Sequence, residues 1–80
     1  MGTIHLDPNP AVRKTSFVQL KNFTENSQTI QLINASGSMA KEIIVNSKGT
    51  SLNLLALSRE IYIVHVSDEK NSVSKRLIKQ

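Results

Sequence analysis

The chain has no cysteine among its 80 residues, and this absence excludes two classes of site. Neither a disulfide framework nor a thiolate metal centre can form without cysteine. The two histidines, His5 and His65, fall on separate predicted strands, and no His/Asp/Glu spacing around them resembles a metal site. We therefore expect no bound metal and no cofactor.

Aromatic residues are scarce, with two phenylalanines, one tyrosine and no tryptophan. Domains that bind single-stranded nucleic acid stack bases on exposed aromatic rings, and no RNA-binding motif is present. The net charge of +4 is therefore not a sign of a nucleic-acid partner. The sequence also lacks a nucleophile elbow and a glycine-rich phosphate loop. Because so short a chain buries only a thin core, we expect no enzyme activity.

Long apolar runs are absent as well. None approaches the roughly 20 residues that a membrane-spanning helix requires, and no signal peptide is recognisable. We expect a monomer with no membrane insertion. Met1 and Gly2 resemble an expression start, so we assign residues 3–80 to a single domain.

What the sequence does contain is a period of two. Val18 and Leu20 alternate with polar neighbours, as do Ile30 and Leu32, and such runs are typical of half-buried strands. Seven strands are predicted, over residues 3–7, 15–22, 28–34, 38–45, 50–54, 61–67 and 71–79. Many short strands separated by turn signals predict an all-β sandwich.

Two segments depart from simple alternation. The run Ile61–Val66 is apolar almost throughout and predicts a central strand covered on both faces. Residues 54–60 favour helix by composition, but seven residues support at most one short turn. Between strands, Gly37 and Gly49 close turn clusters where a glycine is available for positive φ.

The order of short motifs carries the functional information. A Pro-Asn-Pro follows the first strand, an Asn-containing turn ends in glycine, a leucine precedes the tyrosine strand, and a basic strand closes the chain. These motif residues are Pro8, Asn9, Pro10, Asn34, Gly37, Leu57, Tyr62, Lys75, Arg76, Leu77, Ile78 and Lys79. In this order and spacing, over residues 3–80, the chain resembles the type A C-terminal sorting domain of the type IX (Por) secretion system.

Two positions depart from the pattern of that family. Asn34 stands where the family usually has Asp, and either residue can cap a turn through a side-chain oxygen. Glu60 stands where the family has Gly before the tyrosine strand. Because a glycine there suggests positive φ or a close backbone approach, either the 55–60 connection takes another path or Glu60 is strained.

The resemblance implies a fold and a destination. It implies an Ig-like β-sandwich of about seven short, mainly antiparallel strands in two sheets. It also implies that the domain directs an N-terminally attached cargo from the periplasm across the outer membrane, with the type IX translocon and its shuttle and sortase components as partners. A sortase-like protease would then remove the domain, and the cargo would be secreted or attached to the cell surface.

The candidate recognition residues are the C-terminal Lys75, Arg76, Leu77, Ile78 and Lys79. A strand that ends at Lys79 is expected to leave the side chains of Lys75, Arg76 and Lys79 accessible. Alternation puts Lys75 on the same face as Leu77, so that its amine must reach a rim. Residues 75–80 could instead leave the sheet as a tail that a receptor grips. The alternative to a recognition role is that these charges protect an edge strand against aggregation.

Structural roles are expected for the other motif residues. Pro8, Asn9 and Pro10 predict a rigid turn into the sandwich, and Tyr62 is expected in the core.

Two alternatives to a sorting signal remain at this point. One is an Ig-like accessory module that binds carbohydrate or protein, and the other is a domain that merely packs on its parent protein.

Overall fold

The computed structural model describes residues 2–11, 15–23 and 26–80. Met1, half of the predicted expression start, lies outside the described residues. Strands form in the described part at β1 Thr3–Asp7, β2 Thr15–Lys21, β3 Gln28–Ile33, β4 Met39–Val45, β5 Gly49–Asn53, β6 Ile61–Ser67 and β7 Ser72–Ile78. Over those same residues, no helix is long and apolar enough to cross a membrane.

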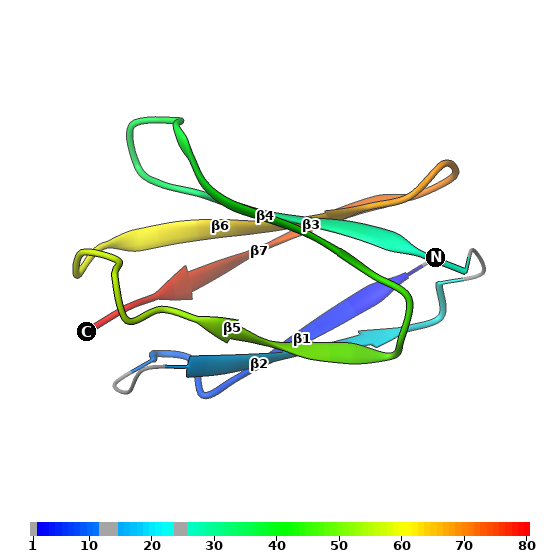
Figure 1. Cartoon of the computed structure of the whole chain (residues 1–80), viewed down its shortest axis with the longest axis horizontal. Helices are drawn as coiled ribbons and strands as arrows, with labels where there is room; N and C mark the ends of the chain where they lie inside the picture. Colours follow the sequence, from blue (N-terminus) through cyan, green and yellow to red (C-terminus); the bar gives the residue numbers. More distant parts are fainter. Residues whose placement is uncertain (1, 12–14, 24–25) are drawn as a thin grey trace.

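The strands make two antiparallel sheets that pack face to face (Figure 1). The smaller sheet has the order β1-β2-β5 and the larger the order β4-β3-β6-β7. The predicted all-β sandwich is therefore confirmed. The strand boundaries also agree with the predicted ones to within a residue at each end.

Period-two alternation explains why these segments become strands. In β2, every second side chain is buried and the others face solvent. The inward residues of both sheets form one apolar core, made of Ile4, Leu6, Ala11, Val18, Leu20, Ile30, Leu32, Val45, Leu52, Leu54, Tyr62, Val64, Val66 and Leu77. Burial of this apolar area is the main force that holds the two sheets together.

The prediction that the Ile61–Val66 run is covered on both faces is wrong. β6 is a central strand of its sheet, but only Tyr62, Val64 and Val66 are buried. Ile61 is 46% exposed and Ile63 is 38% exposed. An antiparallel sheet in a two-layer sandwich has one face in the core and one in solvent, whatever residues the outer face carries.

The turn glycines play different parts. Gly37 has a φ of 89°, within the left-handed region, in a turn where the Asn34 side-chain oxygen accepts hydrogen bonds from the amides of Ser36 and Ser38. Gly49 has no positive φ, contrary to the prediction. It is required instead for close approach, because a Cβ there would lie 2.6 Å from the Val18 carbonyl oxygen.

The 54–60 connection takes a path in which Glu60 has no positive φ, so the alternative of a strained Glu60 is wrong. A single turn forms as predicted, closed by a 3.0 Å hydrogen bond from the Leu57 amide to the Leu54 carbonyl. Among the described residues, the one non-glycine with positive φ is Asn22, not Glu60. The sequence predicted no such role for Asn22, although asparagine tolerates this conformation better than most residues.

Candidate recognition surface

The C-terminal motif lies in β7, at the edge of the four-stranded sheet. The two ends of the chain lie at opposite ends of the long axis of the molecule (Figure 1). β7 pairs antiparallel with β6 through its whole length, and Lys79 continues into an isolated bridge with Ala11. The alternative that residues 75–80 leave the sheet as a free tail is therefore wrong for residues 75–79.

The Pro-Asn-Pro segment closes the outer edge of β7, in an arrangement that we call the clasp (residues 8–11 against residues 76–80). The Asn9 side chain donates a 2.8 Å hydrogen bond to the Arg76 carbonyl and accepts a 3.1 Å bond from the Ile78 amide. One side-chain amide thus pairs with the strand edge as a neighbouring strand would. Asn9 accordingly does more than enter a turn.

Main-chain hydrogen bonds extend the clasp to the end of the chain. The Ala11 amide donates to the Ile78 carbonyl, and the Gln80 amide donates to the Ala11 carbonyl. The buried Ser16 hydroxyl donates to the Pro8 carbonyl at 3.0 Å and so anchors the segment to β2. Two motifs from opposite ends of the sequence therefore make one structural unit.

Lys79 is built into this unit, and the expectation that its side chain is accessible is wrong. The side chain is half-buried, and its Nζ donates hydrogen bonds to the carbonyls of Leu54 and Leu57. The Lys79 amide also donates to the Glu60 carbonyl at 3.0 Å. Lys79 thus ties the chain end to the 54–60 connection.

The strand register places Lys75 on the core-facing side of β7, but its side chain extends to the edge of the sandwich, as alternation predicted. It lies opposite Val64, yet its side chain is exposed, and its Nζ lies 3.4 Å from the Ile4 carbonyl of β1. Lys41 of β4 extends in the same way to the edge next to β5, where its Nζ donates to the Asn53 carbonyl at 3.0 Å. Each lysine places an aliphatic stem over the core and its charge at an open side of the sandwich.

Tyr62 is buried beside the clasp. Its hydroxyl donates a 2.8 Å hydrogen bond to the Ser58 carbonyl, and its side chain lies opposite fully buried Leu77. Burial raises the pKa of the Tyr62 hydroxyl, and the neighbouring Glu60 carboxylate raises it further. The Glu60 carboxylate also accepts the Ala35 amide at 3.2 Å, which joins the Asn34–Gly37 turn to this end of the molecule.

Leu57 completes the motif residues. It is half-buried and packs against the core from the 54–60 connection.

Only some of the C-terminal motif faces outward. Arg76 is exposed and Ile78 is half-buried on the outer face of the sheet, next to Ile63 and Ile61 on β6. Leu77 is fully buried. The sequence-based prediction grouped residues 75–79 together because it could not tell which members of the run the fold would enclose.

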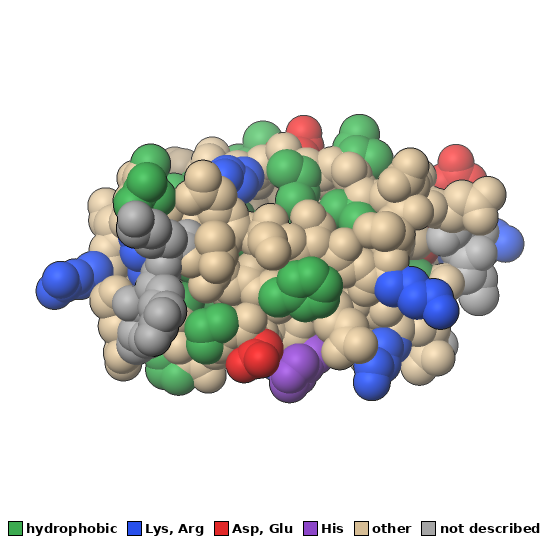
Figure 2. Space-filling view, turned by 60° about the horizontal axis from the view of Figure 1, so that its bottom comes forward, with side chains coloured by type: hydrophobic (Ala, Val, Ile, Leu, Met, Phe, Trp, Pro, Cys, Tyr) green, Lys and Arg blue, Asp and Glu red, His purple; other side chains and the backbone are tan. Residues whose placement is uncertain are grey.

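The outer face of the smaller sheet is different in character. Its side chains over β1, β2 and β5 are mostly uncharged polar groups, with scattered hydrophobic and charged ones (Figure 2). Phe17, 46% exposed, is the large apolar side chain on this face, and it lies over Gly49. No cluster of three or more metal-binding side chains occurs among the described residues.

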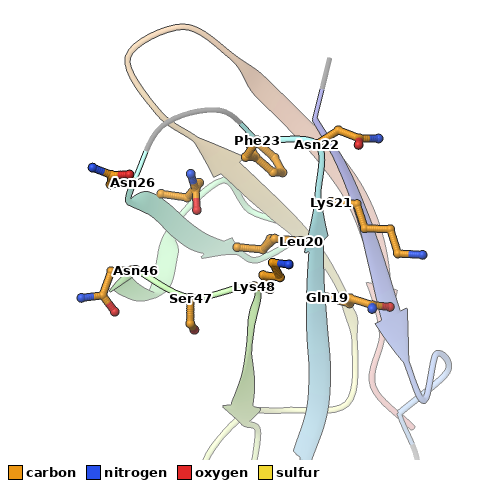
Figure 3. Close-up of a pocket in the computed structure, with 10 residues that line it drawn as sticks. Gln19, Leu20, Lys21, Asn22, Phe23, Asn26, Asn46, Ser47 and Lys48 are labelled. Atoms are coloured by element: carbon orange, nitrogen blue, oxygen red, sulfur yellow. The ribbon is translucent and has the colours of Figure 1, made fainter.

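The opposite end of the molecule has a polar hollow of about 600 Å³ that sequence reasoning did not find (Figure 3). Lys21, Phe23, Asn46 and Lys48 lie around it, brought together by the ends of β2, β4 and the start of β5. Its members come from separate turns, so no local sequence pattern marks them.

Comparison with known families decides which function this geometry belongs to. A family model described as "Secretion system C-terminal sorting domain" matches residues 6–80, nearly the whole chain. The chain belongs to the type IX secretion C-terminal sorting domain family. The match includes both halves of the clasp. No curated protein matches the chain significantly.

Membership fixes the general role. A sorting domain of this family is a type IX secretion signal, and its role is with that secretion system and with a cargo on its N-terminal side. The cargo of such a domain is secreted or displayed at the cell surface. A sorting-signal family is not an enzyme family.

Proposed function

We propose that this sorting domain is read as a folded unit by the outer-membrane type IX translocon, after its cargo has entered the periplasm. A sortase-like protease then removes the domain, and the cargo is released or attached to the surface. The clasp is the observation that supports reading in the folded state. It fixes the C-terminal motif on a sheet edge through two hydrogen bonds of the Asn9 side chain, whose partners Arg76 and Ile78 lie 67 and 69 positions later in the chain.

We assign recognition to the members of the motif whose side chains reach the surface. Arg76 and Ile78 lie on the outer face, and Lys75 presents its amine at the open side next to β1. Leu77 and Lys79 act through the shape of the domain, because one is in the core and the other bonds to main-chain carbonyls. Recognition by charge and by an apolar contact thus comes from three residues of a single strand.

A carbohydrate-binding role has less support. Sugar-binding platforms use exposed aromatic rings, whereas Tyr62 is 2% exposed. Phe17 is the exposed ring of the described residues, and no second ring accompanies it on β1 or β5.

The test is a fusion of residues 3–80 to a reporter protein that carries an ordinary signal peptide. In cells with a type IX system, the reporter should reach the surface, and in matched cells without the translocon it should stay in the periplasm. Arg76→Ala should reduce delivery while the purified domain keeps its thermal unfolding midpoint. Equal surface delivery with and without the translocon would contradict the proposed function.

Removal of the domain needs a separate measurement. Mass spectrometry of the surface-delivered reporter should show loss of the sorting domain in wild-type cells and an uncut fusion in cells that lack the sortase-like protease. An uncut fusion at the surface of both strains would show that delivery does not require removal.

A further inference from the structure

The outer face of the four-stranded sheet carries an apolar cluster that we call the isoleucine patch. Its members are Ile33, Met39, Ile61, Ile63 and Ile78. Register places them side by side, because Ile33 lies opposite both Met39 and Ile63, and Ile61 lies opposite Ile78. Met39 is 54% exposed, Ile61 46% and Ile63 38%, while the other two are half-buried.

The patch is not a general property of this fold's outer surfaces. The outer face of the smaller sheet carries polar residues at nearly every position, with Phe17 as its single large apolar side chain among the described residues. Next to the patch itself, the row Glu42, Gln31, His65 and Ser74 is polar and internally hydrogen-bonded. Contiguous exposed apolar groups with a polar rim are typical of an interaction surface.

Arg76 gives the patch a charge. It lies directly opposite Ile63 on the same face, and its hydrogen bonds within the described residues are made by its main chain. Two acidic side chains of this sheet and of the turn before β6 have other partners, since Glu42 accepts from the Gln31 side chain and Glu60 accepts from the Ala35 amide. The guanidinium is therefore available for a carboxylate on a partner.

We infer that the isoleucine patch with Arg76 is the docking face for a receptor protein of the type IX system, one that presents an apolar surface with a carboxylate opposite Arg76. This inference rests on the proposed function and extends the recognition surface from β7 onto β3, β4 and β6. The C-terminal motif then supplies one margin of a larger face, and the isoleucines of the central strands supply its middle.

Charge argues against two other occupants. A second copy in a two-fold arrangement would bring Arg76 of both copies into one interface between chains of net charge +4. An anionic lipid surface would attract several cations on one face, but Arg76 is the one Lys or Arg that β3, β4, β6 and β7 carry on their outer face, since Lys41 and Lys75 lie opposite buried residues. A protein partner with a localised acidic group fits the single arginine better.

The experiment compares threonine substitutions inside and outside the patch on the same sheet. Ile61→Thr/Ile63→Thr removes two exposed side chains of the patch and keeps β-branching. Ile44→Thr is the matched control, because Ile44 lies on the same outer face, is 76% exposed and is separated from the patch by the polar row. Binding of each purified domain to detergent-solubilised type IX translocon is measured, together with surface delivery of the reporter fusion.

We expect the double variant to bind about tenfold more weakly than wild type, because two apolar side chains that the complex would bury are lost. Ile44→Thr should bind as wild type does. Arg76→Glu should weaken binding by at least about tenfold, and raised salt should weaken wild type but not Arg76→Ala. Thermal unfolding of each variant shows that the fold is retained.

The outcomes separate this inference from the proposed function. If wild type is delivered and the double variant binds and is delivered as well as Ile44→Thr, the docking face is wrong and the proposed function stands. If wild type is not delivered, the proposed function fails first. Patch-dependent dimerisation in sedimentation, or patch-dependent binding to phosphatidylglycerol vesicles, would instead assign the face to a second copy or a membrane and overturn the inference.

Discussion

At the scale of single residues, Asn9 joins the two ends of the sequence. Its side chain makes one donated and one accepted hydrogen bond with the edge of β7. Each such bond contributes about 0.5–1.5 kcal/mol net in proteins. No short-range sequence signal could predict this contact, because the partners are 67 and 69 residues apart.

We expect Asn9→Ala to lower the free energy of unfolding by about 1–3 kcal/mol, since both hydrogen bonds to β7 are lost. Urea unfolding followed by circular dichroism measures the change. Asn46→Ala is the control, because Asn46 is exposed in the turn between β4 and β5. Equal midpoints for the two variants would show that the side-chain clasp adds nothing to stability.

Tyr62 is the second residue whose surroundings make a measurable prediction. Burial first, and then the Glu60 carboxylate, raise its pKa above the ordinary value of 10.0. The folded state therefore disfavours the phenolate. Its stability should be unaffected by this group below pH 10 and should fall as pH rises from there through the folded-state pKa.

Tyr62→Phe should remove this alkaline loss and should cost about 1 kcal/mol at neutral pH, because the hydrogen bond to the Ser58 carbonyl is lost. The chain has one tyrosine, so phenolate absorbance follows this group alone. A wild-type phenolate titration at the value of free tyrosine would contradict the raised pKa.

At the scale of elements, β7 combines inward and outward roles within seven residues. Period-two alternation predicted the strand and the inward phase of Lys75 and Leu77. It did not predict that Lys79, beyond the strand, turns its amine onto the 54–60 connection. Alternation within a strand is a local property, whereas the contact of a chain end with a distant turn is set by the packing of the two sheets.

The β6 segment shows a related limit of sequence interpretation. A run of apolar residues has no polar alternation from which a solvated face could be recognised. The sequence therefore predicts that Ile61 and Ile63 are covered. The structure places them in the isoleucine patch instead. The error in the fold prediction and the omission in the site prediction thus have one cause.

The two C-terminal lysines should differ in their contribution to stability. We expect Lys79→Ala to lower the free energy of unfolding by about 1–3 kcal/mol, because two hydrogen bonds from its charged amine to main-chain carbonyls are lost. Lys75→Ala should change it by less than about 1 kcal/mol, since its side chain is exposed and its contact is long. Guanidinium unfolding of both variants measures the difference, and the reverse order would contradict the assigned roles.

At the scale of the whole molecule, removal of residues 75–80 is expected to unfold the domain rather than to abolish recognition alone. The deletion takes out Leu77 from the core and all hydrogen bonds of the clasp. We expect the truncated domain to lose its cooperative thermal transition and to be digested by protease at least about tenfold faster. A cooperative transition in the truncated domain would show that the core stands without the final strand end.

The clasp makes the edge of β7 depend on the folding of the whole domain. The outer edge of β7 acquires its fixed geometry only by joining a segment made more than sixty residues earlier in the chain. A prematurely terminated chain, or one that failed to fold, would lack the displayed edge even where part of the motif was present. A receptor that reads this edge would thereby distinguish a folded sorting domain from an unfolded one.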